Sequence, residues 1–265
     1  CSVVLVTQDP NAIGRMSCNP AIGGLAKGQI VREIDVLGGQ MGLFSDVSGI
    51  QFKVLNQSKG RSVWSPRAQI DKRVYEKTAK NKVFSTKKIS VLGGEVIRVE
   101  PTKEGFLGFL RNETTVLVKT VVVTCGTFLS GKIHIGERKV LAGRMGEERS
   151  EGITESLKEL GLTSGRLKTG TPPRLIASSI NWDLTNQELG DKNPTPFSYQ
   201  TKDFNPPNIP CFTIKTNINS HLLIKKNIKR SPMFSGDVCG VGPRYCPSIE
   251  DKIHKFQNQD SHLLH

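Results

Sequence analysis

Two cysteines stand in motifs whose residues could carry nucleophilic chemistry. Cys18 opens the stretch CNPAIGGLAKG, and Cys246 lies within GVGPRYCPSIEDK. Gly23 and Gly24 predict a helix start after the first cysteine, and Pro247 predicts another directly after the second. A thiol beside a helix N-terminus has a lowered pKa because the helix dipole stabilises the thiolate. Both thiols are therefore candidate nucleophiles, and a buried cysteine beside a glycine-rich turn is the alternative for the first.

The same motifs suggest dinucleotide binding. Backbone N–H groups at a glycine-rich helix start suit a flavin or a phosphate oxygen. Gly242 and Arg244 would form a pyrophosphate cradle, although Glu250 and Asp251 oppose an anion on the axis of the following helix. Gly126 follows the hydrophobic run TVVVTC, where a glycine lets a dinucleotide approach the backbone closely. An ordinary buried strand with a glycine turn is the alternative for that run.

Positive charge is concentrated in one segment. The chain has 37 Lys and Arg against 24 Asp and Glu, a net charge of +13, and residues 53–92 hold eleven of the cations with two acidic residues. This density indicates contact with a polyanion such as nucleic acid, with a solvated helix face as the alternative. The stretch GRLKTGTPPR, which contains Arg166, Lys168 and Arg174, suggests a phosphate or RNA-backbone loop, or else a solvated linker.

Composition narrows the class of protein. With 265 residues, 36% hydrophobic and 23% charged, the chain suits one large globular domain or one and a half ordinary ones. No apolar run reaches the roughly 18 residues of a membrane span, so we expect no membrane insertion. The six cysteines form no C-x-x-C pair, which argues against a zinc site and favours reduced thiols inside a cell. Neither end carries a start or stop signal, so we expect a fragment.

The hydrophobic pattern predicts three helices. The first follows Gly24 and ends at Gly38, the second begins with Ser65 as N-cap and Pro66 as first residue, and the third runs from Ser150 to Gly161. The residues expected to face inward are Leu25, Ile30, Ile34 and Leu37 in the first helix, Ile70 and Val74 in the second, and Ile153, Leu157 and Leu160 in the third.

Strands are expected between these helices. A buried strand of the parallel kind is predicted at 3–7, and a β-meander that returns to a buried strand is predicted at 89–92, 95–99, 106–110, 115–118 and 120–125. From residue 171 onward, frequent Pro and Asn indicate an extended, irregular segment. This order of elements is typical of flavoproteins that bind two dinucleotides, in which a first strand and its G-x-G-x-x-G loop would precede residue 1.

The motifs taken together resemble those of the MnmG (GidA) family. They occur in the order CNPAIGGLAKG, GIQFKVLNQSKGRSVWSPRAQIDK, VVVTCGTFLSGKIHIGE, GRLKTGTPPR and GPRYCPSIEDK, over essentially the whole chain. The resemblance implies an α/β, Rossmann-type FAD/NAD(P)-binding fold with an inserted β-meander and a second, smaller α/β domain. Residues 1–170 would then belong to the FAD-binding domain, and residues 171–265 to an inserted NAD-binding or substrate domain.

The resemblance also implies an activity. MnmG-like proteins modify C5 of tRNA wobble uridine 34 with an aminomethyl-type group, using FAD, NADH and methylenetetrahydrofolate. Their implied partners are tRNA, an MnmE-type GTPase and a second copy of the chain. With Trp64, the stretch GRSVWSPRAQID resembles the mitochondrial branch of the family more than the bacterial branch. This implies a mitochondrial location, or a cytoplasmic one if the protein is bacterial. The alternatives are a folate- and FAD-dependent tRNA uridine methyltransferase and a non-catalytic RNA-binding fragment. If these 265 residues are a fragment, we expect them to be inactive on their own and to bind FAD weakly or not at all.

The site residues follow from the motifs and from the resemblance. The family's two functional cysteines fall on Cys18 and Cys246, and its FAD positions fall on Val96 and Ser150. The further cofactor-binding residues that we predict are Gly23, Gly24 and Gly126, with Gly242, Pro243, Arg244, Tyr245, Pro247, Ser248, Ile249, Glu250, Asp251, Lys252 and Phe256 in the NAD segment. The predicted RNA-binding residues are Arg67, Arg73, Lys77, Arg166, Lys168 and Arg174.

Overall fold

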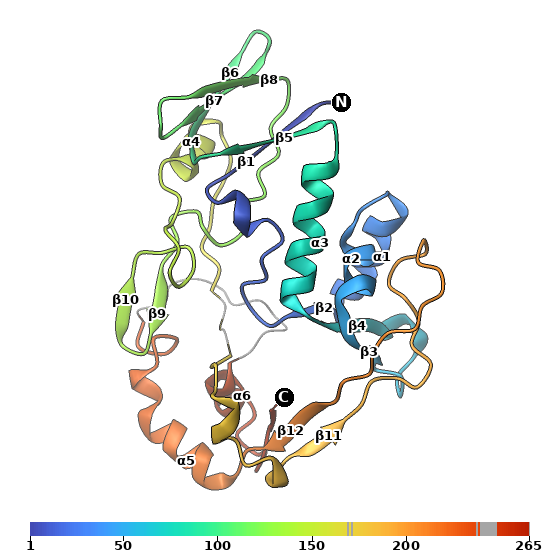
Figure 1. Ribbon diagram of the computed structural model, residues 1–265. Coiled ribbons are helices and arrows are strands. Elements are labelled where there is room, and N and C mark those ends of the chain that lie inside the picture. The colour runs from blue at the N-terminus through green and yellow to red at the C-terminus, as the bar shows by residue number, and fades with distance from the viewer. Residues whose placement is uncertain (169, 171, 237, 239–247, 265) are drawn as a thin grey trace. The chain divides into compact units, whose positions relative to one another are not determined.

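The chain forms two compact units in a computed structural model that describes residues 1–168, 170, 172–236, 238 and 248–264. Unit 1 comprises Cys1–Asn11, Phe84–Thr169 and Lys226–Pro243, and unit 2 comprises Ala12–Val83, Gly170–Lys225 and Arg244–His265. Both contain helices and strands, which confirms the predicted mixed α/β class (Figure 1). The assignment of residues 1–170 to FAD binding and of the remainder to NAD binding stays a prediction.

Unit 1 contains a parallel pair of strands. β1 (Val3–Thr7) and β5 (Ile89–Gly93) pair in parallel with Thr7 beside Gly93, so both strands end at the same edge. The strand at 3–7 is confirmed at its predicted bounds, but its predicted burial is wrong. Its first two valines are 46% and 43% exposed, because β5 is its one neighbouring strand among the described residues.

An antiparallel meander follows in unit 1. β6 (Val96–Thr102), β7 (Gly105–Leu110) and β8 (Thr115–Val118) form a three-stranded sheet. The short apolar segments and the Gly or charged turns between them predicted these strands, and the three strands are confirmed within a few residues of the expected bounds.

Helix α4 (Ile153–Glu159) packs on this meander. The buried hydroxyl of Ser156 donates to the carbonyl of Val99 at 3.0 Å and accepts from its N–H at 2.9 Å. The helix was expected to begin at Ser150, but that residue pairs in a β-bridge and Gly152 adopts a positive φ of 94° before the first turn. The helical pattern therefore starts three residues later than predicted.

The predicted strand at 120–125 is absent from unit 1. Val121, Val122 and Val123 are 40%, 83% and 43% exposed, and no described strand pairs with them. A β-run without a neighbour leaves its backbone groups to water, so the apolar pattern alone does not produce a strand. The next strands are a short hairpin of β9 (Ile133–Ile135) and β10 (Arg138–Val140).

Unit 2 is built on an antiparallel sheet in the order β2 (Ala21–Gly23), β4 (Ser65–Ile70), β3 (Gly49–Leu55). The helices α1 (Lys27–Val36) and α2 (Met41–Ser48) contact each other and β4. These elements surround a core that consists of Val31, Phe52, Ala68, Ile70, Tyr75 and Phe197.

A helix was expected to begin at Ser65 and Pro66, but these residues begin the strand β4, and a helix follows only after it. Ser65, Ala68 and Ile70 are fully or nearly fully buried, since β4 lies between two partner strands. Helix α3 (Lys72–Ser85) begins only after Asp71, whose carboxylate accepts from the N–H groups of the two residues at 73 and 74 at 2.9 and 3.2 Å. Val74, predicted to face inward, is 38% exposed, and Tyr75 and Ala79 are buried instead.

The inward face predicted for α1 is also wrong. Its buried positions are Gly28, Val31 and Asp35, whereas Leu25, Ile30, Ile34 and Leu37 are exposed. A Cβ on Gly28 would stand 2.5 Å from the carbonyl oxygen of Pro66, so this helix face can approach β4 only through a glycine. Close backbone packing, rather than the apolar stripe, decides which side of α1 is buried.

The irregular segment predicted from residue 171 onward is largely confirmed, but it also contains regular elements. A three-stranded sheet is formed by β11 (Asn186–Glu188), β12 (Cys211–Lys215) and β13 (Leu263–Leu264), with helices α5 (Ile218–Asn227) and α6 (Ile249–Lys255). Short 3-10 turns lie at Pro10–Ala12, Arg61–Val63, Ala177–Ser179, Trp182–Leu184 and Ile228–Arg230. Among the described helices, none is both long and apolar enough to cross a membrane.

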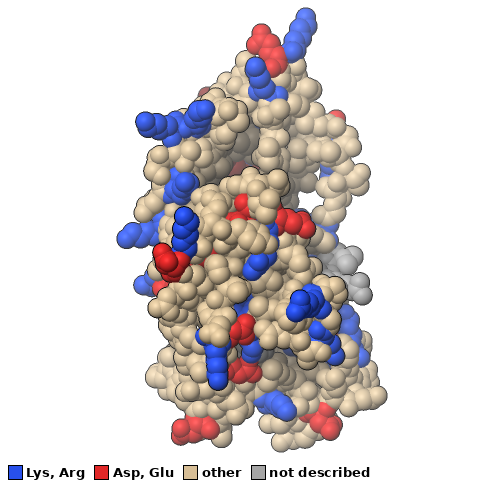
Figure 2. Space-filling model, turned by 90° about the vertical axis from the view of Figure 1, so that its right-hand side faces the viewer, with Lys and Arg blue, Asp and Glu red and all other residues tan. Residues whose placement is uncertain are grey.

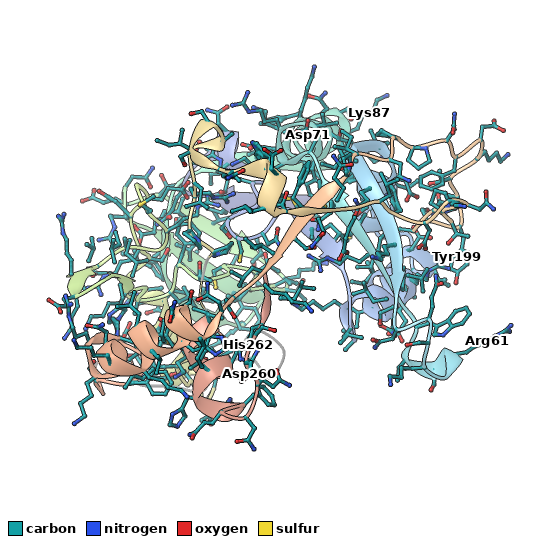
Figure 3. The ribbon with its side chains drawn as sticks, turned by 90° about the horizontal axis from the view of Figure 1, so that it is seen from below. Arg61, Asp71, Lys87, Tyr199, Asp260 and His262 are labelled. Carbon is teal, nitrogen blue, oxygen red and sulfur yellow. The ribbon has the colours of Figure 1, made fainter. Side chains whose placement is uncertain are left out.

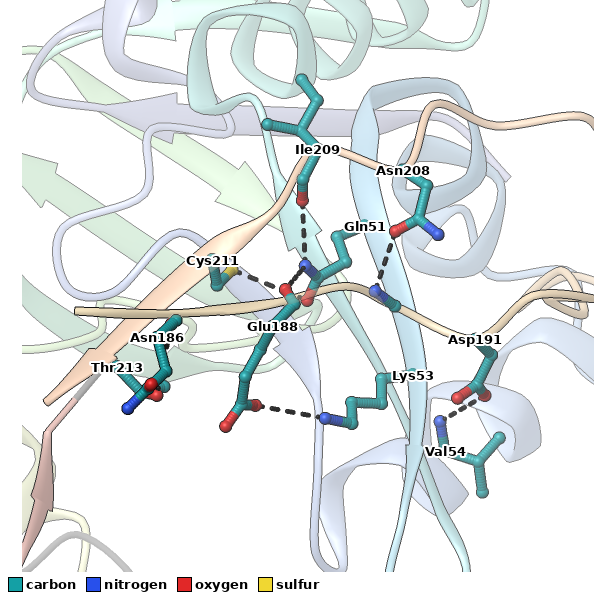
Figure 4. Close-up of polar contacts among 11 residues, drawn as sticks. Gln51, Lys53, Val54, Asn186, Glu188, Asp191, Asn208, Ile209, Cys211 and Thr213 are labelled. Atoms are coloured by element: carbon teal, nitrogen blue, oxygen red, sulfur yellow. Dashed lines mark hydrogen bonds and ion pairs between the residues drawn. The ribbon is translucent and has the colours of Figure 1, made fainter. Parts of the chain in front are cut away.

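One buried glutamine links this segment to the main sheet of unit 2. The amide nitrogen of Gln51 donates to the carbonyls of Glu188 and Ile209, each at 2.9 Å, and its amide oxygen accepts from the thiol of Cys211 at 3.6 Å (Figure 4). The carboxylate of Glu188 also lies 3.2 Å from the ammonium group of Lys53. Cys211 therefore has a structural partner.

Two carboxylates hold the proline-rich segment against α1 and α2. Asp46 accepts from the N–H groups of Phe197 and Ser198 at 2.7 and 2.9 Å, and Asp35 accepts from that of Tyr199 at 2.9 Å. Burial raises the pKa of Asp46, and the nearby Asp35 adds to the rise. The hydrogen bonds that Asp46 accepts from the hydroxyl of Thr201, at 2.6 Å, and from the two N–H groups oppose the rise. These bonds hold the phenyl ring of Phe197, which is 1% exposed, in the core.

Two buried histidines of unit 2 have stacked rings. The rings of His221, on α5, and His262, before β13, are stacked with centroids 5.2 Å apart, and their residues are 2% and 7% exposed. The hydroxyl of Thr216 lies 2.7 Å from Nε2 of His221 and accepts from the backbone N–H of His262 at 2.8 Å. Nε2 of His262 is buried without a hydrogen-bond partner in the described chain.

We expect the stability of the protein to fall as pH drops below about 6.5, the ordinary pKa of histidine. Burial, followed by the charges of His221 and Lys252, lowers the pKa of His262, so the folded state binds fewer protons than the unfolded state. Stability is then fully present above that pH and declines below it. Urea denaturation at pH 7.5 and 5.5 measures the loss. His262→Gln should reduce the pH dependence, whereas replacing the exposed His254 should not; an equal dependence in the two variants would contradict this explanation.

Candidate functional site

A group of polar side chains lies where the parallel strands of unit 1 end. Gln8, directly after β1, donates through Nε2 to the hydroxyl of Ser150 at 3.1 Å and also hydrogen-bonds Glu95. The N–H of Gly94, directly after β5, donates to the carbonyl of Thr7 at 2.9 Å. In open α/β sheets the carboxyl ends of parallel strands are the edge at which ligands bind. This edge is therefore the candidate dinucleotide site of unit 1.

Glu95 ties the two predicted FAD residues together. Its carboxylate accepts two hydrogen bonds from Arg111, at 2.6 and 3.0 Å, and one from the N–H of Glu151 at 2.9 Å. The hydrogen bond from Arg111 is the main reason that the pKa of Glu95 is lowered, so the carboxylate stays charged at neutral pH. Because Val96 follows Glu95 and Ser150 precedes Glu151, these bonds bring together two predicted residues that lie far apart in sequence.

Two residues of unit 1, Ser150 and Gly126, have properties that suit a dinucleotide cofactor. Ser150 is 9% exposed, and its hydroxyl oxygen is oriented by Gln8. Gly126 adopts a positive φ of 59°, and a Cβ added there would meet no atom within 4 Å. A backbone left open in this way permits the close approach that a dinucleotide needs. Within unit 1 the described residues thus provide a polar hydroxyl and an accessible glycine for the predicted FAD.

Cys18 lies in unit 2 beside another predicted motif. Its half-buried thiol is 4.0 Å from the carbonyl oxygen of Gly170. Nη2 of Arg174 donates to the backbone carbonyl of Cys18 at 3.3 Å. The sequence motifs CNPAIGG and GTPPR, 152 or more residues apart, are therefore adjacent. The expectation that a helix opens at Gly23 and Gly24, one turn after Cys18, is wrong, because Gly23 ends β2 and α1 starts only at Lys27. The helix-dipole argument for this thiol no longer applies.

The two glycines of this motif have structural roles. Gly23 has a φ of +84°, and a Cβ there would lie 2.2 Å from the carbonyl oxygen of Pro66 and 2.6 Å from the ring of Phe197. The N–H of Gly24 donates to the same carbonyl at 2.8 Å, and its own carbonyl accepts from the N–H groups of residues 27 and 28. Tight packing against β4 accounts for the glycine at position 23, and the positive φ of 93° accounts for Gly24. A role of either residue in cofactor binding stays a prediction.

The second cysteine motif is described only in part. Cys246, Gly242, Pro243, Arg244, Tyr245 and Pro247 lie outside the described residues. Helix α6 begins at Ile249 with Ser248 as N-cap, and Ser248 and Asp251 bond each other's backbone N–H groups in a capping box. With Glu250 and Asp251 both in its first turn, this helix start disfavours a pyrophosphate on its axis, as the sequence indicated. Lys252 lies on α6, and Phe256 is the first residue after that helix.

The predicted RNA-binding cations lie on several elements. In unit 2, Arg73 and Lys77 are exposed one turn apart on α3, and Arg67 is half-buried on β4. In unit 1, Nη1 of Arg166 donates to the carbonyl of Ser130 at 3.0 Å. Figure 2 shows Lys and Arg side chains as separate groups, with neutral surface and some acidic side chains between them. On the face that Figure 2 shows, Lys and Arg side chains therefore form no single continuous basic surface.

Replacing Arg67, Arg73 and Lys77 together by glutamine should weaken the binding of any tRNA to a similar extent. Each phosphate contact that is lost should flatten the dependence of log affinity on log salt by about 0.7–0.9. Titrations of two unrelated tRNAs at several salt concentrations measure both effects. Lys103→Gln, at an exposed cation outside residues 53–92, is the control. An unchanged slope in the triple variant would leave these cations a role in solubility alone.

Some residues at these sites were not predicted. Gln8, Glu95 and Gly170 make the bonds that join the predicted residues, yet the sequence pattern did not single them out. A usable signal exists for the first two, since each closely follows a predicted strand of the parallel pair. In the described part of the chain, no group of three or more His, Cys, Asp or Glu could hold a metal ion.

Comparison with known proteins gives consistent results. The sequence profile of the family described as Glucose inhibited division protein A matches residues 1–265. Two proteins named tRNA uridine 5-carboxymethylaminomethyl modification enzyme MnmG, one from Campylobacter fetus subsp. fetus and one from a Nitratiruptor species, are 47% and 48% identical over 264 residues. Each alignment covers 98% of this chain and 42% of the relative, so the chain spans about two fifths of their length.

A solved structure matches the fold. The form I crystal structure of Aquifex aeolicus GidA superposes with a TM-score of 0.89 at 40% sequence identity. The match covers 98% of this chain and 45% of that chain. The arrangement of strands and helices described above is therefore that of a known fold.

Proposed function

The chain belongs to the Glucose inhibited division protein A family, and from this membership we propose that the protein modifies C5 of the wobble uridine, position 34, of tRNA. The observation that carries the proposal is the 47–48% identity, over 98% of the chain, to enzymes named for tRNA uridine 5-carboxymethylaminomethyl modification. The group installed is of the aminomethyl type, either carboxymethylaminomethyl or taurinomethyl.

The cofactors of the proposed reaction are FAD and NADH, with methylenetetrahydrofolate as one-carbon donor. Ser150 at the strand edge of unit 1, with Val96 and Gly126 of the same unit, would hold FAD. NADH would bind the segment from Gly242 to Phe256, away from the acidic start of α6. When bound, these groups supply the one-carbon unit and the electrons of the reaction.

The protein's own thiols would activate the base. Uridine C5 is a poor nucleophile, so the thiolate of Cys246 adds to C6 and the electron pair of the C5–C6 double bond makes C5 able to attack a one-carbon electrophile. Cys18 then removes the proton from C5, and expulsion of the thiolate from C6 restores the double bond. The reverse assignment of the two thiols is the alternative.

The partners of this reaction are tRNA, an MnmE-type GTPase and a second copy of the chain. The unpaired anticodon loop offers uridine 34 without melting a helix. We propose a mitochondrial location because the stretch around Trp64 resembles the mitochondrial branch of the family. The bacterial source of the relatives named above favours the bacterial cytoplasm as the alternative.

Reconstitution with the full-length protein tests the proposal. The reaction contains tRNA, the GTPase partner with GTP, FAD, NADH, an amine (glycine, taurine or ammonium, each in a separate reaction) and methylenetetrahydrofolate labelled in its methylene carbon. The label is located by nucleoside mass spectrometry. We expect the label in an aminomethyl group at uridine 34, and none in a tRNA that carries cytidine there. Label in 5-methyluridine would identify the methyltransferase alternative, and tRNA binding without label would identify a non-catalytic RNA-binding module.

A further inference from the structure

The hairpin that joins β3 to β4 carries an indole ring in a fixed position. Nε1 of Trp64 donates to the carbonyl of Lys59 at 3.1 Å, across the loop. The loop itself is closed by the N–H of Lys59, which donates to the carbonyl of Asn56 at 2.9 Å, and Asn56 adopts a positive φ of 62°. The ring is therefore held by the loop rather than free to rotate, and 37% of the residue stays exposed.

An arginine accompanies this ring. The guanidinium carbon of Arg61 lies 5.6 Å from the centroid of the Trp64 ring, within the range of a cation–π contact. Figure 3 shows Arg61 at the outer end of the hairpin with its side chain directed away from the strands. Two flat groups, one aromatic and one cationic, thus stand together at an exposed tip.

The tip is anchored at its base. Nε2 of Gln29, on α1, donates to the carbonyl of Trp64 and to the hydroxyl of Ser65, each at 3.1 Å, and Ser65 is fully buried. A platform fixed in this way loses little conformational entropy when a ligand stacks on it. The rigidity comes from unit 2 alone and needs no partner.

The charge of the hairpin suits an anion. Residues 49–70 contain no Asp or Glu and carry Lys53, Lys59, Arg61 and Arg67. Glu188 pairs with Lys53, and Asp191 accepts a hydrogen bond from Gln57, so Arg61 and Lys59 are the cationic residues that contact the ring. An exposed aromatic ring beside cations is the combination that binds unpaired nucleotides: bases stack on the ring or on the guanidinium, and the cations contact phosphates.

We propose that Trp64 and Arg61 form a stacking platform for an unpaired base of RNA. In the proposed function, that RNA is the tRNA. This inference rests on the proposed function for the identity of the RNA. The alternative is that the indole only closes the hairpin, through its bond to Lys59.

The test measures binding of a fluorescein-labelled ten-nucleotide oligouridylate, and of tRNA, to the full-length protein at several salt concentrations. Trp64→Leu, which keeps an apolar side chain but removes the aromatic face, should weaken oligouridylate binding about tenfold at every salt concentration and leave the salt slope unchanged. Trp64→Phe should restore most of the affinity. Arg61→Gln, which removes both the flat guanidinium and its charge, should weaken binding and in addition flatten the salt slope by about 0.7, the value for one phosphate contact to a single strand.

Trp182→Leu provides the matched control. Trp182 is 44% exposed and packs on Phe212, with ring centroids 4.6 Å apart, in another part of unit 2. Its replacement should leave binding unchanged, and equal weakening by both substitutions would overturn the proposal. Oligouridylate affinity of Trp64→Leu equal to that of the wild-type protein would also overturn the proposal. If that variant still binds tRNA, the proposed function survives. Failure of the wild-type protein to bind tRNA would overturn both.

Discussion

Replacing Cys246 by serine is expected to stop uridine modification, with a loss on the order of a thousandfold or more, while FAD content and tRNA affinity survive. The change keeps the side-chain volume nearly constant. It exchanges a thiol with an ordinary pKa of about 8.5 for a hydroxyl that barely ionises, and only the thiolate can add to C6. The measurement is modified uridine 34 formed per enzyme in the reconstituted reaction of the full-length protein.

Cys1→Ser is the matched control, because Cys1 is an exposed thiol outside every motif. It should leave the reaction unchanged. Alkylation gives a second readout: Cys246 should react faster than Cys125, whose pKa is raised by burial so that less thiolate is present. Near-normal turnover of Cys246→Ser would mean that the side chain only fills space beside Pro247, and would remove it from the mechanism.

Gly23→Ala is expected to destabilise the protein by about 3–5 kcal/mol. Part of this cost, about 1–2 kcal/mol, comes from placing a Cβ on a backbone with a φ of +84°. The remainder comes from overpacking, because the new Cβ would stand 2.2 Å from the carbonyl oxygen of Pro66 and 2.6 Å from the ring of Phe197. Denaturant titration measures the free energy of unfolding.

The adjacent glycine provides the control for this substitution. Gly24 also has a positive φ, 93°, but a Cβ there would meet only a methyl group of Leu55, at 4.0 Å. Gly24→Ala should therefore cost about 1–2 kcal/mol, the backbone strain alone. Equal losses at the two positions would show that packing against β4 is not what requires a glycine at position 23.

The parts of the fold that depend on local pattern could be predicted from the sequence. The strand β1 is a short continuous apolar run, the meander β6–β8 consists of short apolar segments between Gly or charged turns, and all four strands were found. The helix expected at Ser65 and Pro66 failed because the same two residues also begin a strand, and only the partners β2 and β3 decide between them. The strand expected at 120–125 failed for the opposite reason, since it lacks a partner in the described chain.

The candidate site could be predicted only in outline. Val96 and Ser150 were named from the family resemblance, but the bonds that bring them together run through Gln8 and Glu95, whose roles depend on the parallel pairing of β1 and β5. The sequence also placed Cys18 beside a helix start, whereas its neighbours are Gly170 and Arg174, more than 150 residues away. Local spacing cannot reveal contacts over such separations.

The most direct test of the central claim is the mass of the nucleoside at position 34 of tRNA in cells. The full-length gene is supplied to a bacterial strain whose own copy of the family member has been deleted, and the wobble nucleoside is isolated and weighed. The proposed function predicts that an aminomethyl-type group returns at C5 of uridine 34, and that it does not return with Cys246→Ser. An unmodified wobble uridine in cells that contain the folded wild-type protein and its GTPase partner would contradict the claim.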